Sequence, residues 1–225
     1  MLKRVLSVLL PVAGVPLVLA AGYLLFGAQK YAWICLCAAA LSCVPFFLSF
    51  EKGRANAQRL ALLAVMTALS VAGRVLFAAL PGFKPVTALV VLTAMYFGPQ
   101  AGFMTGALSA LLSNFYFGQG PWTPLQMFAW GMVGFLAGLL AKPLQKSRAA
   151  LLLYGAFSGA LFSLVMDVWT VLWWDGGFRL SRYAAAAVSS AGFMAVYAVS
   201  NVVFLLVLAR PVGRVFERLR QKYGL

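Results

Sequence analysis

The chain has 225 residues, of which 64% are hydrophobic and only 10% are charged, with a formal net charge of +14. This composition excludes an ordinary soluble domain and indicates a membrane protein built as one polytopic unit. Because the basic residues lie at the ends of apolar stretches, they indicate topology, and nucleic acid is not an expected partner.

Eight membrane spans are predicted along the chain, all of them helices. The first span follows Met1-Leu2-Lys3-Arg4 as in a signal peptide, but its apolar part is longer than in such peptides, so we expect it to stay uncleaved. The approximate bounds of the eight spans are 5–26, 31–50, 60–80, 86–97, 100–114, 124–141, 149–173 and 184–209.

The number eight depends on whether residues 86–97 and 100–114 form two spans or one helix through Gly98-Pro99-Gln100. Two spans give thirteen basic residues inside and four outside, whereas one helix gives seven inside and ten outside, against the positive-inside rule. We therefore expect eight spans and cytoplasmic termini. The inside set is Lys3, Arg4, Lys52, Arg54, Arg59, Lys142, Lys146, Arg148, Arg210, Arg214, Arg218, Arg220 and Lys222, and the outside set is Lys30, Lys84, Arg179 and Arg182.

Between two of these spans, residues 113–130 (SNFYFGQGPWTPLQMFAW) bring together neutral polar and aromatic side chains. Such a set suits small-molecule binding better than bond-breaking. Gly118 and Gly120 favour an ordered turn, and Thr123-Pro124 is typical of a helix N-cap followed by proline. The alternative is a membrane-interface turn with its rings at headgroup depth. The candidate substrate contacts are Asn114, Tyr116, Gln119, Trp122, Thr123 and Gln126.

Two other predicted external connectors combine glycine or proline with aromatic and charged residues. Residues 81–85 carry Lys84, and residues 174–183 carry Trp174 and Asp175. Together with residues 115–123 these loops are able to roof a pocket that opens to the outside, with Lys84, Trp174 and Asp175 as further candidate contacts.

Two ionisable residues, Arg74 and Asp167, fall inside predicted spans at similar depths in the outer third of the membrane. An unpaired charge costs about 2.5 to 3.5 kcal/mol at a helix centre. The two residues are therefore candidates for an ion pair, and Arg74 is also a candidate substrate contact.

Small residues form stripes along three of the predicted spans. Residues 57–72 carry alanine at three- or four-residue intervals on one helical face, which lets another helix approach closely. This face serves either a partner or packing within the chain, as do two glycine pairs. The alanines are Ala57, Ala61, Ala64, Ala68 and Ala72, and the glycine pairs are Gly102 with Gly106 and Gly134 with Gly138.

Several catalytic chemistries are excluded by the residues that the chain lacks. It has no histidine and no G-x-x-x-x-G-K-[ST] phosphate loop, so serine–histidine catalysis, the H-E-x-x-H zinc site and ATP hydrolysis by the usual route are not expected. Cys35, Cys37 and Cys43 lie in one apolar run and are expected to be lipid-facing or packing residues. We therefore expect no enzymatic activity and no cofactor.

Gly73-Arg74, the loop ending in Lys84-Pro85, the alanine stripe and above all residues 113–131 resemble the substrate-binding S component of an energy-coupling factor (ECF) vitamin transporter. The resemblance covers about residues 57–210 and six spans. It implies an all-α six-helix bundle with a basic cytoplasmic tail over residues 57–225, preceded by a two-span addition over residues 1–56. Its docking residues on the transmembrane coupling subunit would be Ala64, Ala68 and Ala72.

The resemblance implies a vitamin receptor in the plasma membrane of a prokaryote, with a coupling subunit and two ATPase subunits as partners. Within the family the chain is most similar to the group associated with cobalamin. An S component for another vitamin or a nucleoside-like precursor is the alternative, and a non-transporting membrane scaffold is a different class of function that stays open.

Overall fold

The computed structural model describes residue 43, residues 57–175 and residues 177–223, which are helical with short connectors and contain no strand. The predicted spans 5–26 and 31–50, with Cys35 and Cys37, lie outside the described residues. Cys43 is buried in a cluster with Phe103 and Phe135, so it is a packing residue.

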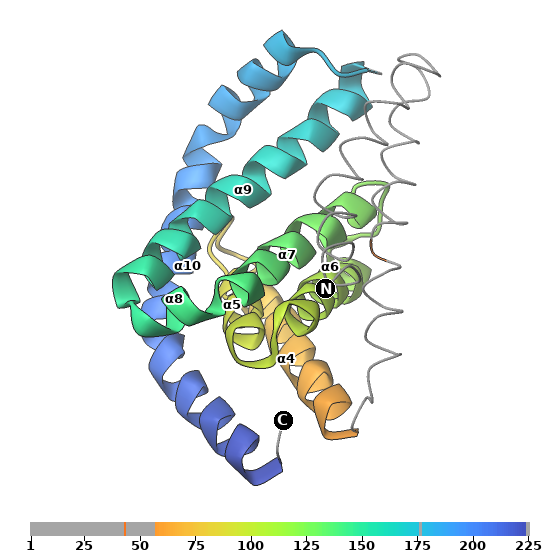
Figure 1. Ribbon diagram of the computed structural model, residues 1–225. Helices are drawn as coiled ribbons and strands as arrows, with labels where there is room; N and C mark the ends of the chain where they lie inside the picture. The colour runs from red at the N-terminus through yellow and green to blue at the C-terminus, as the bar shows by residue number, and fades with distance from the viewer. Residues whose placement is uncertain (1–42, 44–56, 176, 224–225) are drawn as a thin grey trace, which may run out of the picture.

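Figure 1 shows the helices of the described chain, six longer ones and the short α8. Three of them are long and apolar enough to cross a membrane, namely α4, α9 and α10. An all-helical fold is therefore confirmed for the described residues, while the number of spans and the side of each terminus stay predictions. The bounds are α4 (Ala57–Leu76), α5 (Val86–Phe97), α6 (Pro99–Phe117), α7 (Thr123–Leu139), α8 (Ala141–Lys146), α9 (Arg148–Asp175) and α10 (Leu180–Tyr223).

A break at Gly98 separates α5 from α6. The backbone φ of Gly98 is 92°, in the left-handed region that favours glycine, and its N–H donates to the Ala94 carbonyl 2.9 Å away. Pro99 then opens α6, where its missing N–H costs no helical hydrogen bond. This confirms two separate helices, the condition on which the eight-span count depends.

The central helix of the bundle is α5. All its residues except Tyr96 are buried, and it packs against α4, α6, α7 and α10. Its 12 residues span about 18 Å, short of the roughly 30 Å of a hydrocarbon core. A helix that is apolar on every side fits this place because other helices surround it.

Glycines allow α6 and α7 to approach each other closely. A Cβ atom added to Gly102 would lie 2.7 Å from the carbonyl oxygen of Gly134, and one added to Gly106 would meet the carbonyl group of Trp130. Backbones come this close only where one of them carries no side chain. The glycine pairs seen in the sequence therefore serve packing within the chain.

We expect Gly134→Ala to lower the free energy of unfolding by about 1 to 3 kcal/mol, because the new methyl group overpacks the contact with Gly102 and Val90. Thermal unfolding of the purified protein in detergent measures this loss. The matched control is Gly192→Ala in α10, where an added Cβ meets nothing within 4 Å. An equal loss in both variants would contradict a specific close crossing.

At one edge of the bundle, α9 and α10 run side by side (Figure 1). The Asn201 side chain donates from Nδ2 to the Gly155 carbonyl 3.1 Å away. With 44 residues, α10 is far longer than the predicted 184–209 and continues through Pro211, so the predicted basic tail is helical. The extension is held because Phe216 packs on Phe97 of α5, with ring centroids 4.9 Å apart.

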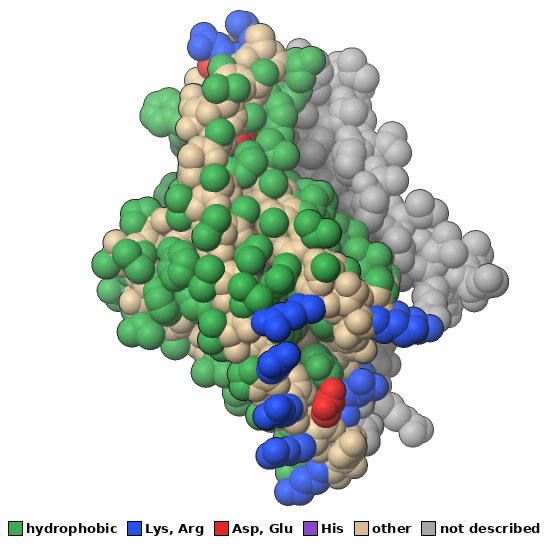
Figure 2. Space-filling model, turned by 90° about the vertical axis from the view of Figure 1, so that its left-hand side faces the viewer, with side chains coloured by type: hydrophobic (Ala, Val, Ile, Leu, Met, Phe, Trp, Pro, Cys, Tyr) green, Lys and Arg blue, Asp and Glu red, His purple; other side chains and the backbone are tan. Residues whose placement is uncertain are grey.

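The bundle has two ends that differ in their elements. The connectors 77–85 and 118–122 lie at one end, which we call the loop end. At the other, the tail end, lie α8 and the last turns of α10, and the Gln145 side chain donates to the Met95 carbonyl 2.6 Å away. Figure 2 shows a broad apolar surface with a large group of Lys and Arg side chains below it and a smaller one at its tip. An apolar belt between charged ends is typical of a multi-pass membrane protein.

Candidate functional site

Arg74, near the end of α4, reaches across to α6. Its Nη1 donates to the Ser113 hydroxyl and, at 2.9 Å, to Oδ1 of Asn114. The guanidinium carbon lies 4.4 Å from the ring centroid of Phe117 and 5.1 Å from that of Trp130. The guanidinium therefore combines hydrogen bonds with two cation–π contacts, which hold it in one orientation.

Asn114 joins three helices through one buried amide group. Its side chain is 1% exposed, and Oδ1 accepts the hydrogen bond from Arg74 of α4. Its Nδ2 donates to Oγ1 of Thr123 at 2.9 Å and to Oε1 of Gln126 at 2.8 Å, both in α7. Loss of Asn114 would leave Oε1 of the buried Gln126 without its donor, whereas Arg74 keeps Ser113 and Thr123 keeps Gln119.

The 118–122 connector extends the network to the surface. Thr123 donates from Oγ1 to Oε1 of Gln119 at 3.0 Å, and Gln119 donates from Nε2 to the Leu111 carbonyl at 2.9 Å. Gly118, with a φ of 102°, makes the turn possible. The prediction that Thr123 caps α7 is wrong, because Trp122 is the N-cap residue and the Thr123 hydroxyl bonds within the network.

Lys84 lies beside this network on the connector between α4 and α5. Its backbone N–H donates to the Ser200 hydroxyl at 2.8 Å, which anchors the connector to α10. Its ammonium lies 5.6 Å from the ring centroid of Trp130 and 5.4 Å from that of Tyr197. Burial, and then the charge of Arg74, lowers the pKa of Lys84 from 10.5 to about 8.

Trp130 and Tyr197 form the base of the network, because both cations lie near the Trp130 ring and Lys84 also lies near the Tyr197 ring. Both side chains are fully buried, and Trp130 donates from Nε1 to the Tyr197 hydroxyl at 2.6 Å. Phe162 stacks on Trp130 with ring centroids 4.9 Å apart. The sequence did not identify these residues as site candidates, because their pairing depends on how α7, α9 and α10 pack.

The remaining candidates lie away from the network. Tyr116, Trp122 and Trp174 are 68%, 38% and 80% exposed, and Asp175 pairs with Arg182 at 3.8 Å. The structure thus brings together six of the predicted polar residues with the newly found Tyr197, seven in all. It leaves the exposed rings at the periphery. These seven are Arg74, Lys84, Asn114, Gln119, Thr123, Gln126 and Tyr197, and Ser113 and Trp130 complete the network and its base.

Arg74 and Asp167, which the sequence offered as an ion pair, have different partners. Arg74 bonds to α6, while Oδ2 of Asp167 accepts from the Ser190 hydroxyl at 2.6 Å. The one ion pair of the described residues joins Asp175 and Arg182. The polar network therefore contains two cations and neutral amides and hydroxyls, with no described carboxylate bonded to it. Such a site is equipped to bind a polar ligand.

The alanine stripe lies on the exposed face of α4. Ala64, Ala68 and Ala72 are exposed, whereas Leu63 and Met66 on the other face are buried in the core. Packing within the described residues therefore does not use these alanines, and a docking role for them stays a prediction.

The lowered pKa of Lys84 gives a pH-dependent stability. Since this pKa lies below that of the unfolded chain, the unfolded state binds more protons between pH 8 and 10.5, and stability rises with pH there. The unfolding temperature of the wild type should therefore rise relative to that of Lys84→Met between pH 8 and 10.5. Below pH 8 the difference between the two proteins should be constant. Arg74 and Tyr197, which face the ammonium, are present in both proteins. A constant difference up to pH 10.5 would contradict the lowered pKa.

Comparison with known proteins finds one family. A family model described as "ECF-type riboflavin transporter, S component" matches residues 54–218. No curated protein and no solved structure matches the chain. The matched residues include the whole network around Asn114 and the exposed alanines of α4.

Proposed function

Since the chain belongs to the ECF-type riboflavin transporter S component family, we propose that it is the substrate-binding membrane subunit of an ECF importer for a vitamin. In this role it binds its substrate without chemical change. A transmembrane coupling subunit and two ATPase subunits, supplied by other chains, energise the uptake. The proposed location is the plasma membrane of a prokaryote, with the loop end outside and both termini in the cytoplasm.

The observation that carries this proposal is the convergence of α4, α6 and α7 on one polar network at the loop end. Arg74, Asn114 and Gln126 come from three different helices and meet through hydrogen bonds of 2.8 and 2.9 Å. These groups satisfy one another's hydrogen bonds. A substrate that enters between the helices can exchange these bonds for its own, which makes binding sensitive to helix position.

The chemistry of the site favours a substrate with a flat conjugated ring and neutral polar groups. The partly exposed Phe117 offers a ring face, the amides of Asn114 and Gln126 offer donors and acceptors, and Arg74 is a donor to carbonyl oxygens. The family description makes riboflavin the first candidate. Cobalamin, which also has conjugated and amide surface, is the second, and a nucleoside-like precursor is a further alternative.

The exposed alanines of α4 are proposed as the docking face for the coupling subunit. Ala64, Ala68 and Ala72 lie four residues apart on an exposed face of α4. Small side chains on such a face let a partner helix approach closely within the bilayer. The site and the docking face then lie on the same helix, α4, because Arg74 follows Ala72 by two positions.

The experiment that tests the function is ligand identification followed by titration. Mass spectrometry of the protein purified in detergent should find a co-purified vitamin, and isothermal titration with riboflavin and then cobalamin should give saturable binding to one of them. The exposed rings of Tyr116, Trp122 and Trp174 fit the alternative of a membrane scaffold anchored at the interface. No bound molecule and no titratable binding of any candidate would favour that alternative.

A further inference from the structure

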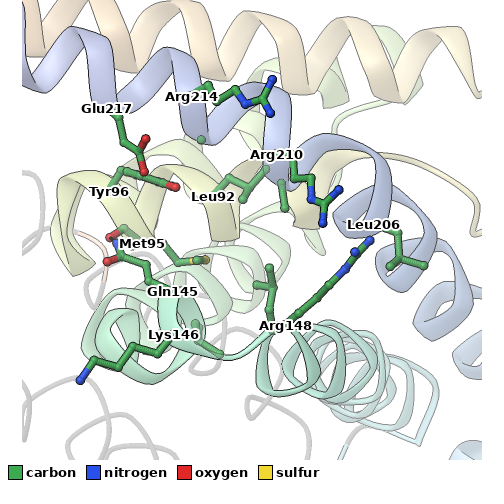
Figure 3. A pocket seen from close by; sticks show the side chains of 14 residues that line it. Leu92, Met95, Tyr96, Gln145, Lys146, Arg148, Leu206, Arg210, Arg214 and Glu217 are labelled. Carbon is green, nitrogen blue, oxygen red and sulfur yellow. Dashed lines mark hydrogen bonds between the residues drawn. The ribbon is translucent and has the colours of Figure 1, made fainter.

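A second site candidate lies at the tail end, far from the network around Asn114. A cavity of about 440 Å³ opens there between the end of α5, the short helix α8, the start of α9 and the second half of α10. Figure 3 shows the side chains that line it. Gln145 comes from α8 and Arg148 from the start of α9, while Arg210 and Arg214 come from α10, so the cavity joins elements more than 60 positions apart in the chain.

The polar part of this cavity is strongly basic. Four cations line it, and Figure 3 shows the guanidinium groups of Arg148 and Arg210 pointing toward one another. The lining acid, Glu217, lies on the Tyr96 side of the cavity, and no ion pair among the described residues involves any of the four cations. Two guanidinium groups that converge without a carboxylate between them form a site for an anion. The four cations are Lys146, Arg148, Arg210 and Arg214.

Guanidinium groups favour a particular class of anion. Each presents planar pairs of N–H donors that match the oxygens of a phosphate, and the pairing is stronger than that of neutral hydrogen bonds. A phosphate therefore fits the space between Arg148 and Arg210 better than a halide or another anion without matched oxygens.

Another part of the cavity wall is apolar, which favours a lipid-borne phosphate over a free one. Leu92, Leu151, Leu206 and Ala209 line it, and Leu206 is 39% exposed at its edge. Figure 2 shows that broad apolar surface adjoins the basic group at this end of the molecule. A ligand with a phosphate head and hydrocarbon chains satisfies both surfaces, since its head meets the arginines while its chains lie along the apolar belt.

We propose that this cavity binds the phosphate group of an anionic phospholipid from the leaflet at the tail end. Arg148 and Arg210 hold the phosphate, Arg214 adds positive charge nearby, and the leucine wall receives the start of the acyl chains. Binding there links α8 and α9 to α10, and it stabilises the folded protein by an amount that rises with the logarithm of the lipid concentration over its dissociation constant.

The test compares three probes on the delipidated full-length protein in detergent. Phosphatidylglycerol at about 100 times its dissociation constant should raise the unfolding temperature by about 5 to 10 °C. Phosphatidylcholine with the same acyl chains, and inorganic phosphate at the same concentration, should give much smaller shifts. Equal shifts with the two lipids would overturn the proposal, and an equal shift with inorganic phosphate would assign the cavity to free phosphate instead.

Two double variants that lose the same net charge test whether the lipid binds at this cavity. Arg148→Gln with Arg210→Gln should weaken the apparent affinity for phosphatidylglycerol at least about tenfold, measured by native mass spectrometry of the bound lipid. The control is Lys142→Gln with Arg218→Gln, which removes two exposed cations that do not line the cavity. Equal weakening in both double variants would show a diffuse charge effect and overturn the site. The comparison of the three probes uses the wild-type protein, so it tests the proposal even if a variant folds poorly.

Discussion

Replacing Asn114 with alanine is expected to weaken substrate binding by about ten- to a hundredfold. The substitution removes three side-chain hydrogen bonds from a residue that is 1% exposed, and it leaves Arg74 and Gln126 without this partner. An unpaired buried polar group costs about 1 to 3 kcal/mol, and each 1.4 kcal/mol corresponds to a factor of ten in affinity. Isothermal titration of wild type and variant with riboflavin, or with the vitamin found by mass spectrometry, measures the change.

Two further variants, one in the network and one outside it, separate this effect on binding from a general loss of structure. Gln119→Ala should have a smaller effect, about threefold to tenfold, because Gln119 is exposed and its contribution is shared with water. Ser189→Ala should change nothing, since its exposed hydroxyl bonds only to the Ala185 carbonyl of its own helix. An unchanged affinity in Asn114→Ala, with the wild-type unfolding temperature, would mean that residues 113–130 are an interfacial turn and that the site lies elsewhere.

Replacing Ala64 and Ala68 together with tryptophan is expected to abolish assembly with the coupling subunit and leave substrate binding by the isolated protein intact. Both side chains are exposed on α4, so the new rings fit without disturbing the core of this chain. A partner helix that packs against alanine cannot approach past two indole rings. Co-purification of the coupling and ATPase subunits with the tagged variant measures assembly, and titration of the isolated variant measures substrate binding.

The matched control for this prediction is Ala191→Trp. Ala191 is also an exposed alanine on an apolar helix, but it lies on α10. Its substitution should leave both assembly and substrate binding unchanged. Full assembly of the Ala64→Trp, Ala68→Trp variant would place the docking face elsewhere, whereas loss of assembly in both variants would indicate a general effect of bulk on the membrane surface.

Local features of the sequence predicted the elements of the site well. Asn114, Gln119 and Thr123 lie within ten positions, and Gly118 supplies the positive φ that a turn between two helices requires. A helix end, a tight turn and a helix start bring such close neighbours together with little help from the rest of the fold. The break at Gly98-Pro99 was predictable for the same reason.

Contacts between distant segments were not predictable in this way. Arg74 is hydrogen-bonded to Asn114, which is 40 positions away in the chain, and Trp130 to Tyr197, which is 67 positions away. The predicted partner of Arg74, Asp167, is hydrogen-bonded to Ser190 instead. Depth in the membrane can be counted along a helix, but the rotation of a helix about its axis cannot. The similar depths of Arg74 and Asp167 in the membrane therefore did not predict whether the two side chains meet.

The sequence by itself determined that the chain is helical and membrane-embedded, because composition and the spacing of apolar runs set these properties locally. It also placed the polar residues of the 113–126 segment at one end of the bundle. Only the tertiary structure decided which faces meet. The glycines at 102 and 134 let α6 and α7 cross closely, and the packing of α10 brings Tyr197 under Trp130 and Arg210 toward Arg148. Helix rotation and crossing depend on side chains from several helices at once, and no single stretch of sequence contains that information.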